Sequence, residues 1–350
     1  MKTIQTVTGA LRAEEAKHIC VHEHLILDMT HEAIEPETDE AKKLFWDDIR
    51  MEHLGVLRHN PYVVRTNLVL DSVEDAVAEV KPLMAAGCNL LLDLTSVGLG
   101  RDVKKLRDIS ERSGLNVACG CGLFVHDSRV EPYADWSVEQ ITAAMLREIR
   151  EGIGDTGIRP GVIGEIGTSE VLYPIERRAL LAAADVSVET DLPVYVHTYP
   201  WSRAGLEAVD LLLAHGVKPQ RICICHLDVT FDEGTIFRAL DRGVYVEFDN
   251  LSKEFYFPPD DGAFAGGPFE TDVARVRMLK KLTELGYADR LLLANDLCLK
   301  ASLHKYGGDG YDYVFGHFAM MMRMEDIPED EVRRLLDENP KRFLFGDGRE

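Results

Sequence analysis

The 350-residue chain has no long apolar run and comparatively little positive charge. No apolar stretch reaches the ~18–20 residues that a membrane-spanning helix needs, and the first residues, Met-Lys-Thr-Ile-Gln-Thr-Val-Thr-Gly, lack a signal-peptide core. Lys and Arg number 39 against 60 Asp and Glu, for a net charge of −21. Nucleic acids and anionic membranes are bound mainly through basic surfaces, so we expect neither as a partner. We expect a cytoplasmic protein that acts on a small-molecule substrate.

Cysteine is also scarce. The seven cysteines are dispersed, their number is odd, and no C-x-x-C zinc spacing occurs. Two C-x-C pairs lie in apolar runs, where both members of a pair would point to one face of a strand. We therefore predict reduced cysteines in the core. A G-x-S-x-G motif is absent too, so the serine-esterase signature is missing.

Short apolar runs recur along the whole chain and predict eight strands. They are His18–His22, Asn89–Thr95, Asn116–Val125, Gly161–Gly167, Val194–Thr198, Ile222–His226, Val244–Asp249 and Leu291–Asp296. Stretches with apolar residues at helical spacing separate them, namely Ser72–Ala86, Asp102–Arg112, Ser137–Glu151, Ile175–Glu189, Ala204–Ala214 and Val273–Leu285. This alternation predicts a parallel sheet covered by helices. Eight such units predict a single (β/α)8 barrel, as one domain over residues 1–350.

Two stretches interrupt the alternation. Residues 28–71 follow the first predicted strand, and residues 250–271 follow the seventh. Loops this long are uncommon unless they cover or shape a site, and in a barrel the loops after strands lie at the catalytic face. Tyr256, Tyr62 and Trp46 in these loops are candidate pocket walls, although each could equally pack only within its loop.

Six potential metal ligands lie near the ends of predicted strands. The first strand leads into His22-Glu-His24, in which both imidazoles share a face at period two. The other four, near the ends of the fourth, fifth, sixth and eighth strands, are Glu165, His197, His226 and Asp296. The carboxyl ends of barrel strands converge on one pocket. Four imidazoles and two carboxylates suit Zn²⁺, Mn²⁺ or Co²⁺, with a position left open for water.

This ligand set resembles the binuclear metal centre of the amidohydrolase superfamily. More narrowly, nearly the whole chain resembles the phosphotriesterase-related proteins. The stretches that carry the resemblance are His22-Glu-His-Leu25, Gly100-Arg-Asp102, Gly161-Val-Ile-Gly-Glu-Ile-Gly-Thr-Ser-Glu170, His226-Leu-Asp228, Tyr306-Gly-Gly-Asp-Gly-Tyr311 and Asn339-Pro-Lys-Arg342. The resemblance implies a barrel hydrolase with two divalent metal ions per chain. Zinc is the first expectation, with manganese, cobalt or nickel as alternatives, and a homodimer is the oligomer suggested by analogy.

The resemblance also divides the ligands between two metals. It assigns His22, His24 and Asp296 to the more buried metal, and His197 and His226 to the more exposed one. Glu165 would bridge them. In the phosphotriesterases proper this bridge is a carboxylated lysine, and residues 161–170 contain no lysine. The chain therefore resembles a glutamate-bridged subset, which argues against organophosphate hydrolysis as the native activity and against a carbon dioxide requirement.

Two cations ~3.5–4 Å apart that share a water lower the pKa of that water towards neutrality. The resulting hydroxide would attack a carbonyl or phosphoryl group, and Asp296 could pass its proton to the leaving group. We predict hydrolysis of a small, possibly anionic lactone, carboxylic ester or amide, with phosphotriester or phosphoester hydrolysis as the alternative. A mononuclear deaminase and a binding protein on an inactive barrel are disfavoured, the first by the Glu165 bridge and the second by the complete ligand set.

Four further residues are candidates for contacts around the centre. Lys253 and Lys300 could pair with an anionic substrate group, or could be solvated loop lysines. Tyr256 is a candidate substrate contact. Asp228, two residues after His226, could orient a metal ligand, or could be a surface or capping aspartate.

Overall fold

The computed structural model describes residues 2–128, 130–258 and 267–346. Its main sheet has eight parallel strands in the order β14-β11-β10-β9-β8-β7-β6-β3. Their bounds are β3 (His18–Glu23), β6 (Cys88–Asp93), β7 (Asn116–Cys121), β8 (Val162–Gly167), β9 (Val194–His197), β10 (Ile222–Ile224), β11 (Tyr245–Phe248) and β14 (Leu291–Leu293). The backbone N–H of Asp296 donates to the carbonyl of His22 at 3.2 Å, which links the two edges. The predicted (β/α)8 barrel is confirmed.

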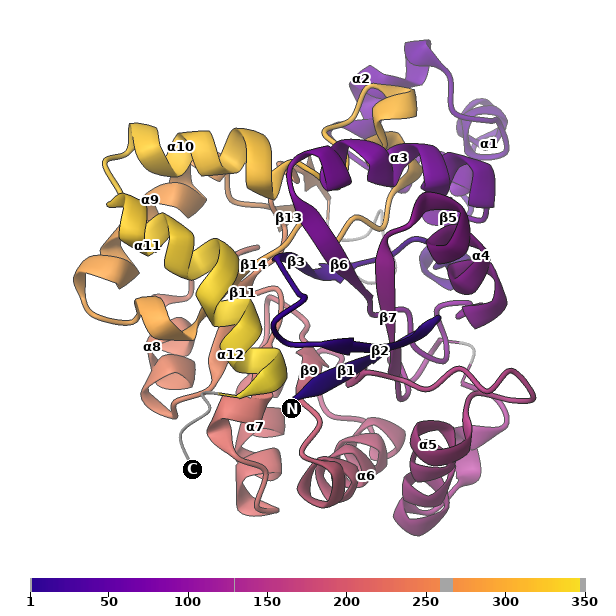
Figure 1. Cartoon of the computed structure of the whole chain (residues 1–350). Helices are drawn as coiled ribbons and strands as arrows, with labels where there is room; N and C mark the ends of the chain where they lie inside the picture. The colour runs from indigo at the N-terminus through magenta and orange to yellow at the C-terminus, as the bar shows by residue number, and fades with distance from the viewer. Residues whose placement is uncertain (1, 129, 259–266, 347–350) are drawn as a thin grey trace.

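Helices surround this sheet (Figure 1). Those between strands are α3 (Val73–Ala85), α4 (Val103–Ser113), α5 (Val138–Glu151), α6 (Pro174–Thr190), α7 (Ala204–Ala214), α8 (Glu233–Asp241) and α9 (Asp272–Glu284). After β14 come α10 (Ala319–Met324), α11 (Glu329–Arg333) and α12 (Asn339–Phe345). The six helices predicted from apolar spacing all form, with ends within one residue of the prediction. The prediction missed α8 and α10–α12, which are shorter than most of the helices it found.

The barrel interior is a packed core. Side chains from alternate strand positions fill it, among them Val21, Leu92 and Tyr195, which are fully or almost fully buried. An N-terminal hairpin, β1 (Thr3–Thr6) and β2 (Gly9–Arg12), and helix α12 cross the end of the barrel that faces the viewer in Figure 1. All seven cysteines are free and six are buried, as predicted. With this end closed, the pocket lies at the opposite, carboxyl end of the strands.

The two long segments fold over that carboxyl end. Residues 28–71 contain α1 (Asp39–Phe45) and α2 (Leu54–Leu57), and their ends pair as β4 (Leu27–Asp28) with β5 (Val69–Leu70). In the second segment, β12 (Tyr256–Phe257) pairs with β13 (Gly267–Pro268). Residues 259–266 of the predicted second loop lie outside the described residues. The backbone N–H of Tyr256 donates to the carbonyl of His59 at 3.1 Å, so the two segments meet.

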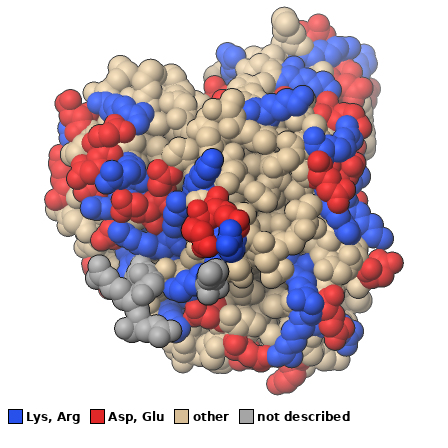
Figure 2. Space-filling model, in the orientation of Figure 1, with Lys and Arg blue, Asp and Glu red and all other residues tan. Residues whose placement is uncertain are grey.

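Charge is mixed on the face that Figure 2 shows, where acidic and basic side chains are interspersed. Exposed ion pairs occur among the described residues, such as Arg12 with Glu15 at 2.7 Å and Lys281 with Glu233 at 2.7 Å. None of the helices in the described ranges is both long and apolar enough to cross a membrane.

Candidate metal centre

The carboxylate of Glu165 on β8 lies between two pairs of histidines. Its Oε2 is 3.4 Å from Nε2 of His22 and 3.7 Å from Nε2 of His24. Its Oε1 is 3.2 Å from Nδ1 of His197 and 3.1 Å from Nε2 of His226. Each carboxylate oxygen therefore faces one pair, which is the arrangement that a bridging ligand requires.

Asp296 completes the first group of candidate ligands. Its Oδ1 lies 3.0 Å from Nε2 of His24 and 3.6 Å from Nε2 of His22. Ligand atoms that share one zinc ion at ~2.0–2.2 Å and tetrahedral angles stand roughly 3.4 Å apart, so these spacings fit a shared cation. Nδ1 of His24 is 2.9 Å from Oγ1 of Thr95, which leaves Nε2 for the metal. Nε2 of His22 is buried and has no hydrogen-bond partner among the described groups, which a cation would supply.

Two carboxylates on β11 or just after it hold the outer nitrogens of the histidines. Glu247 Oε2 is 2.9 Å from Nδ1 of His22, and Asp249 Oδ1 is 3.0 Å from Nδ1 of His226. A carboxylate behind an imidazole fixes its orientation and its tautomer, so the opposite nitrogen faces the metal. Neither residue was predicted from the sequence as part of the site. The available signal was their period-two spacing in an otherwise apolar strand, which places both on the face of the barrel that bears the ligands.

The surroundings keep the carboxylates of the candidate ligands Glu165 and Asp296 ionised. Burial opposes ionisation of Glu165, but the imidazoles of His22 and His197 outweigh it and hold its pKa well below the usual range. Burial likewise opposes ionisation of Asp296, yet the ammonium of Lys253 lowers its pKa. Lys253 Nζ lies 2.5 Å from Oδ2 of Asp296, and both side chains are buried. Anionic carboxylates are the form that binds cations.

Two of the candidate ligands adopt unusual backbone conformations. His226 has φ of 64° and Asp296 has φ of 45°, in the left-handed region that residues other than glycine seldom occupy. Such strain concentrates at functional sites, where the surrounding structure enforces it. His226 lies two residues after the end of β10 and Asp296 lies three residues after the end of β14, so the chain turns just beyond the strands where the candidate ligands are presented.

Lys300 and Tyr256 lie outside the pocket next to these ligands. Lys300 Nζ is 3.9 Å from Oδ1 of Asp71, in a separate hollow. The side chain of Tyr256 is 74% exposed, whereas its neighbours Phe255 and Phe257 line the pocket. Because successive strand residues face opposite sides, Tyr256 on β12 points away from the side that Phe257 occupies.

Asp228 is buried but contacts none of the six ligands. Its Oδ2 lies 3.0 Å from Nε of Arg275 and accepts the backbone N–H of Asn250 at 2.9 Å. The side-chain amide of Asn250 also donates to Asp249 at 2.8 Å. Asp228 is thus joined to His226 through Asn250 and Asp249.

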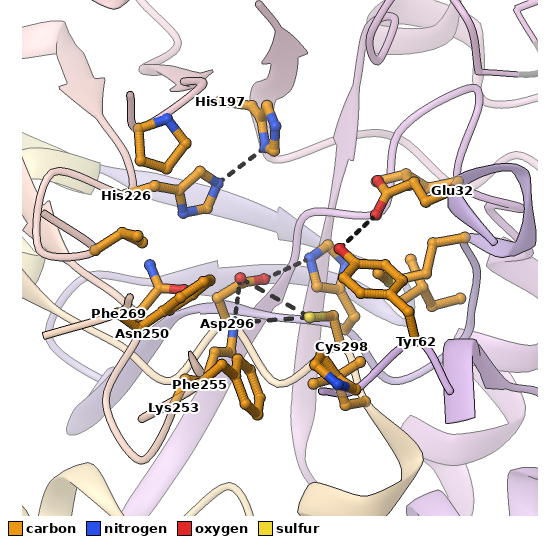
Figure 3. Close-up of a pocket in the computed structure, with 18 of the residues that line it drawn as sticks. Glu32, Tyr62, His197, His226, Asn250, Lys253, Phe255, Phe269, Asp296 and Cys298 are labelled. Atoms are coloured by element: carbon orange, nitrogen blue, oxygen red, sulfur yellow. Dashed lines mark hydrogen bonds and ion pairs between the residues drawn. The ribbon is translucent and has the colours of Figure 1, made fainter. Parts of the chain in front are cut away.

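The pocket above the candidate ligands is mostly apolar and has a cavity volume of about 90 Å3. Its apolar walls are Leu27, Met29, Pro61, Leu99, Phe124, Pro200, Val229, Phe255, Phe257, Phe269 and Leu299. Tyr62 and Glu32 also line it, on the side away from His226 (Figure 3). Trp46, a further candidate wall, is 59% exposed and lies outside it. Glu32 was missed because nothing in the pattern of residues 28–71 separates it from the other acidic residues there.

The chain is similar to known proteins over nearly its whole length. The model of the phosphotriesterase family matches residues 2–344. N-acetyltaurine hydrolase from Xenopus tropicalis is 31% identical over 344 residues, which cover 97% of each chain. A phosphotriesterase-related protein from Nematostella vectensis is 30% identical with the same coverage.

Two solved structures extend the similarity to the fold. A resiniferatoxin-binding protein from Rhodobacter sphaeroides has a TM-score of 0.93 and 33% identity, over 98% of this chain and 94% of that chain. A phosphotriesterase homology protein from Escherichia coli, complexed with phosphate in its active site, has a TM-score of 0.77 and 27% identity, over 94% of this chain and 99% of that chain. The described chain belongs to the phosphotriesterase family and is a hydrolase.

Proposed function

We propose that this chain is a binuclear metal-dependent hydrolase of a small amide, carboxylic ester or lactone. The observation that carries the proposal is the position of Glu165, whose two carboxylate oxygens face two separate histidine pairs. We assign the metal ions to two ligand groups, His22, His24 and Asp296 in one and His197 and His226 in the other. Glu165 is common to both groups. Zinc suits this donor set best, and manganese, cobalt and nickel also fit it.

When bound, the two cations would polarise the scissile carbonyl and lower the pKa of the attacking water. Asp296 accepts a proton from that water at its carboxylate and donates it to the departing amine or alcohol. Lys253 keeps the carboxylate ionised and fixes its position through the contact at 2.5 Å. The apolar walls limit the number of competing water molecules near the scissile bond.

An amide is the leading substrate class because relatives that align over 97% of this chain are named N-acetyltaurine hydrolases. Phosphoester hydrolysis is the second candidate, since the Escherichia coli relative holds phosphate in its active site. The bridging position favours the first class, because Glu165 stands where the phosphotriesterases proper carry a carboxylated lysine.

The test is to load purified protein with Zn²⁺ or Mn²⁺ and assay N-acyl amides, carboxylic esters, lactones and a neutral phosphotriester in parallel. We expect metal-dependent turnover of a carbonyl substrate that a chelator abolishes and fresh metal restores. Turnover of the phosphotriester alone would select the second candidate. Carbonyl hydrolysis that persists after complete metal removal would contradict the proposal.

A further inference from the structure

Arg275, near the start of helix α9, is a fully buried arginine that the proposed reaction does not use. Its Nη1 lies 2.7 Å from Oδ1 of Asp272, and its Nε lies 3.0 Å from Oδ2 of Asp228. Both of these carboxylates are buried as well. A guanidinium is a rigid, planar group, so it holds two such partners in a fixed position relative to each other. Each partner continues into a separate set of contacts.

The contacts of Asp228 lead to the candidate ligand His226. Asp228 Oδ2 accepts the backbone N–H of Asn250 at 2.9 Å, and its Oδ1 accepts the side-chain amide of Asn250 at 3.1 Å. The same amide donates at 2.8 Å to Oδ1 of Asp249, the oxygen that lies 3.0 Å from Nδ1 of His226. All four residues are buried. A displacement of Asp228 therefore displaces the carboxylate that orients the imidazole of His226.

The contacts of Asp272 lead to the other group of candidate ligands. Asp272 Oδ2 accepts the backbone N–H of Ser252 at 2.9 Å. Ser252 has φ of 71°, in the left-handed region, and a residue other than glycine keeps such a conformation only where its surroundings enforce it. The next residue is Lys253, whose Nζ lies 2.5 Å from Oδ2 of Asp296. The bond from Ser252 to Asp272 thus fixes the backbone from which Lys253 reaches Asp296.

We propose that Arg275 is a positioning residue that sets the geometry of both ligand groups through its two carboxylate partners. The contacts through Asp228 determine how tightly the group of His197 and His226 holds its metal ion. The contacts through Asp272 determine how accurately Asp296 is placed for proton transfer. This inference rests on the proposed hydrolysis and adds to it the residue that joins the loops after β10 and β11.

The main test compares Arg275→Lys with wild type, because lysine keeps the charge but cannot hold both carboxylates in the fixed geometry of a guanidinium. Zn²⁺ affinity at the His226 group should fall roughly tenfold or more, as for the loss of a residue behind a metal ligand. Competition with a zinc indicator measures both sites, and His197→Ala identifies which affinity belongs to that group. With the metal-loaded enzyme, kcat should fall by up to roughly 100-fold, the effect of a misplacement of about 1 Å, with little change in KM.

Variants of the two partners separate the two sets of contacts. Asp228→Asn turns one acceptor oxygen into a donor that cannot pair with Asn250, so it should lower the Zn²⁺ affinity of the His226 group. Asp272→Asn should lower kcat and leave that affinity close to the wild-type value.

The matched control is Arg221→Met. Arg221 Nη2 lies 2.6 Å from Oδ2 of Asp191, just before β10 and at the opposite end of that strand from His226. Its loss should lower stability without changing either Zn²⁺ affinity or kcat.

Thermal unfolding of each variant measures the loss of stability separately. Wild-type Zn²⁺ affinity and kcat in Arg275→Lys would overturn the inference, and so would equal losses of both in Arg221→Met. If Arg275→Lys does not fold, wild-type behaviour of Asp228→Asn and Asp272→Asn would overturn it instead. Two bound zinc ions without turnover of any carbonyl substrate would overturn the proposed reaction, while a lower Zn²⁺ affinity in Arg275→Lys would still support the positioning role. A wild-type chain that binds no zinc would count against both.

Discussion

Lys253 and Asp296 form a buried ion pair in which Nζ and Oδ2 are 2.5 Å apart, and the other carboxylate oxygen of Asp296 lies 3.0 Å from Nε2 of His24. The lysine thus contacts a candidate metal ligand directly. Burial disfavours the ammonium, but the Asp296 carboxylate outweighs it and raises the pKa of Lys253. Lys253 is therefore placed to orient the carboxylate of Asp296, whatever the charge of the substrate.

The first prediction concerns this pair. Lys253→Met should lower kcat for neutral and anionic substrates alike, because Asp296 loses the group that fixes it, and breaking a buried pair costs about 3–5 kcal/mol. Lys253→Arg should restore part of the activity. Lys300→Met is the matched control, a loop lysine outside the pocket, and should behave as wild type. An increase in KM confined to anionic substrates would instead show that Lys253 binds the substrate.

The second prediction concerns Asp249, whose Oδ1 is 3.0 Å from Nδ1 of His226. Asp249→Asn preserves the shape of the side chain but replaces the carboxylate with a weaker acceptor. Removing such an outer partner typically weakens metal binding roughly 10–100-fold. Competition with a metal indicator measures the affinity of each site. If both sites keep wild-type affinity, Asp249 does not orient His226.

The third prediction concerns the pH dependence of stability. Burial raises the pKa of Glu32 to about 8, above a value of about 4.3 in the unfolded chain. Between these values the unfolded chain releases a proton that the folded chain retains, so this carboxyl makes the protein less stable as pH rises. Glu32→Gln does not titrate, so its stability relative to wild type should increase from about pH 5 to about pH 8. Urea unfolding at matched metal content measures this difference, and a constant difference would refute the expected titration.

The sequence predicts the barrel well because its strands and helices follow a regular pattern of apolar residues. Apolar runs of the right length alternate with amphipathic helices, and parallel strands bring their carboxyl ends together. His197 and His226 could be located for this reason, although they are far apart from His22 in the chain. Lys253 could only be placed near the pocket, because the ion pair with Asp296 depends on the conformation of the loop after β11.

The loops were harder to predict because no periodicity determines which side chains face inward. Tyr256 was a candidate contact, yet it is exposed while Phe257 beside it lines the pocket. A shift of one residue along the two-residue strand β12 decides which of the two side chains faces the pocket. Glu32 is distinguished only by tertiary contacts, above all the hydrogen bond from Tyr62. Substrate specificity therefore depends on the least predictable segments of the chain.

Metal stoichiometry in the absence of bicarbonate tests the central claim most directly. Apoprotein is reconstituted with Zn²⁺ in buffer freed of carbon dioxide, and bound metal is measured by elemental analysis beside Glu165→Gln. Because Glu165 brings its own carboxylate to both histidine pairs, wild type should bind two zinc ions per chain with or without bicarbonate. Glu165→Gln should fall below two, since a neutral amide bridges two cations poorly. A wild-type chain that binds two ions only with bicarbonate, or never more than one, would contradict a binuclear centre bridged by Glu165.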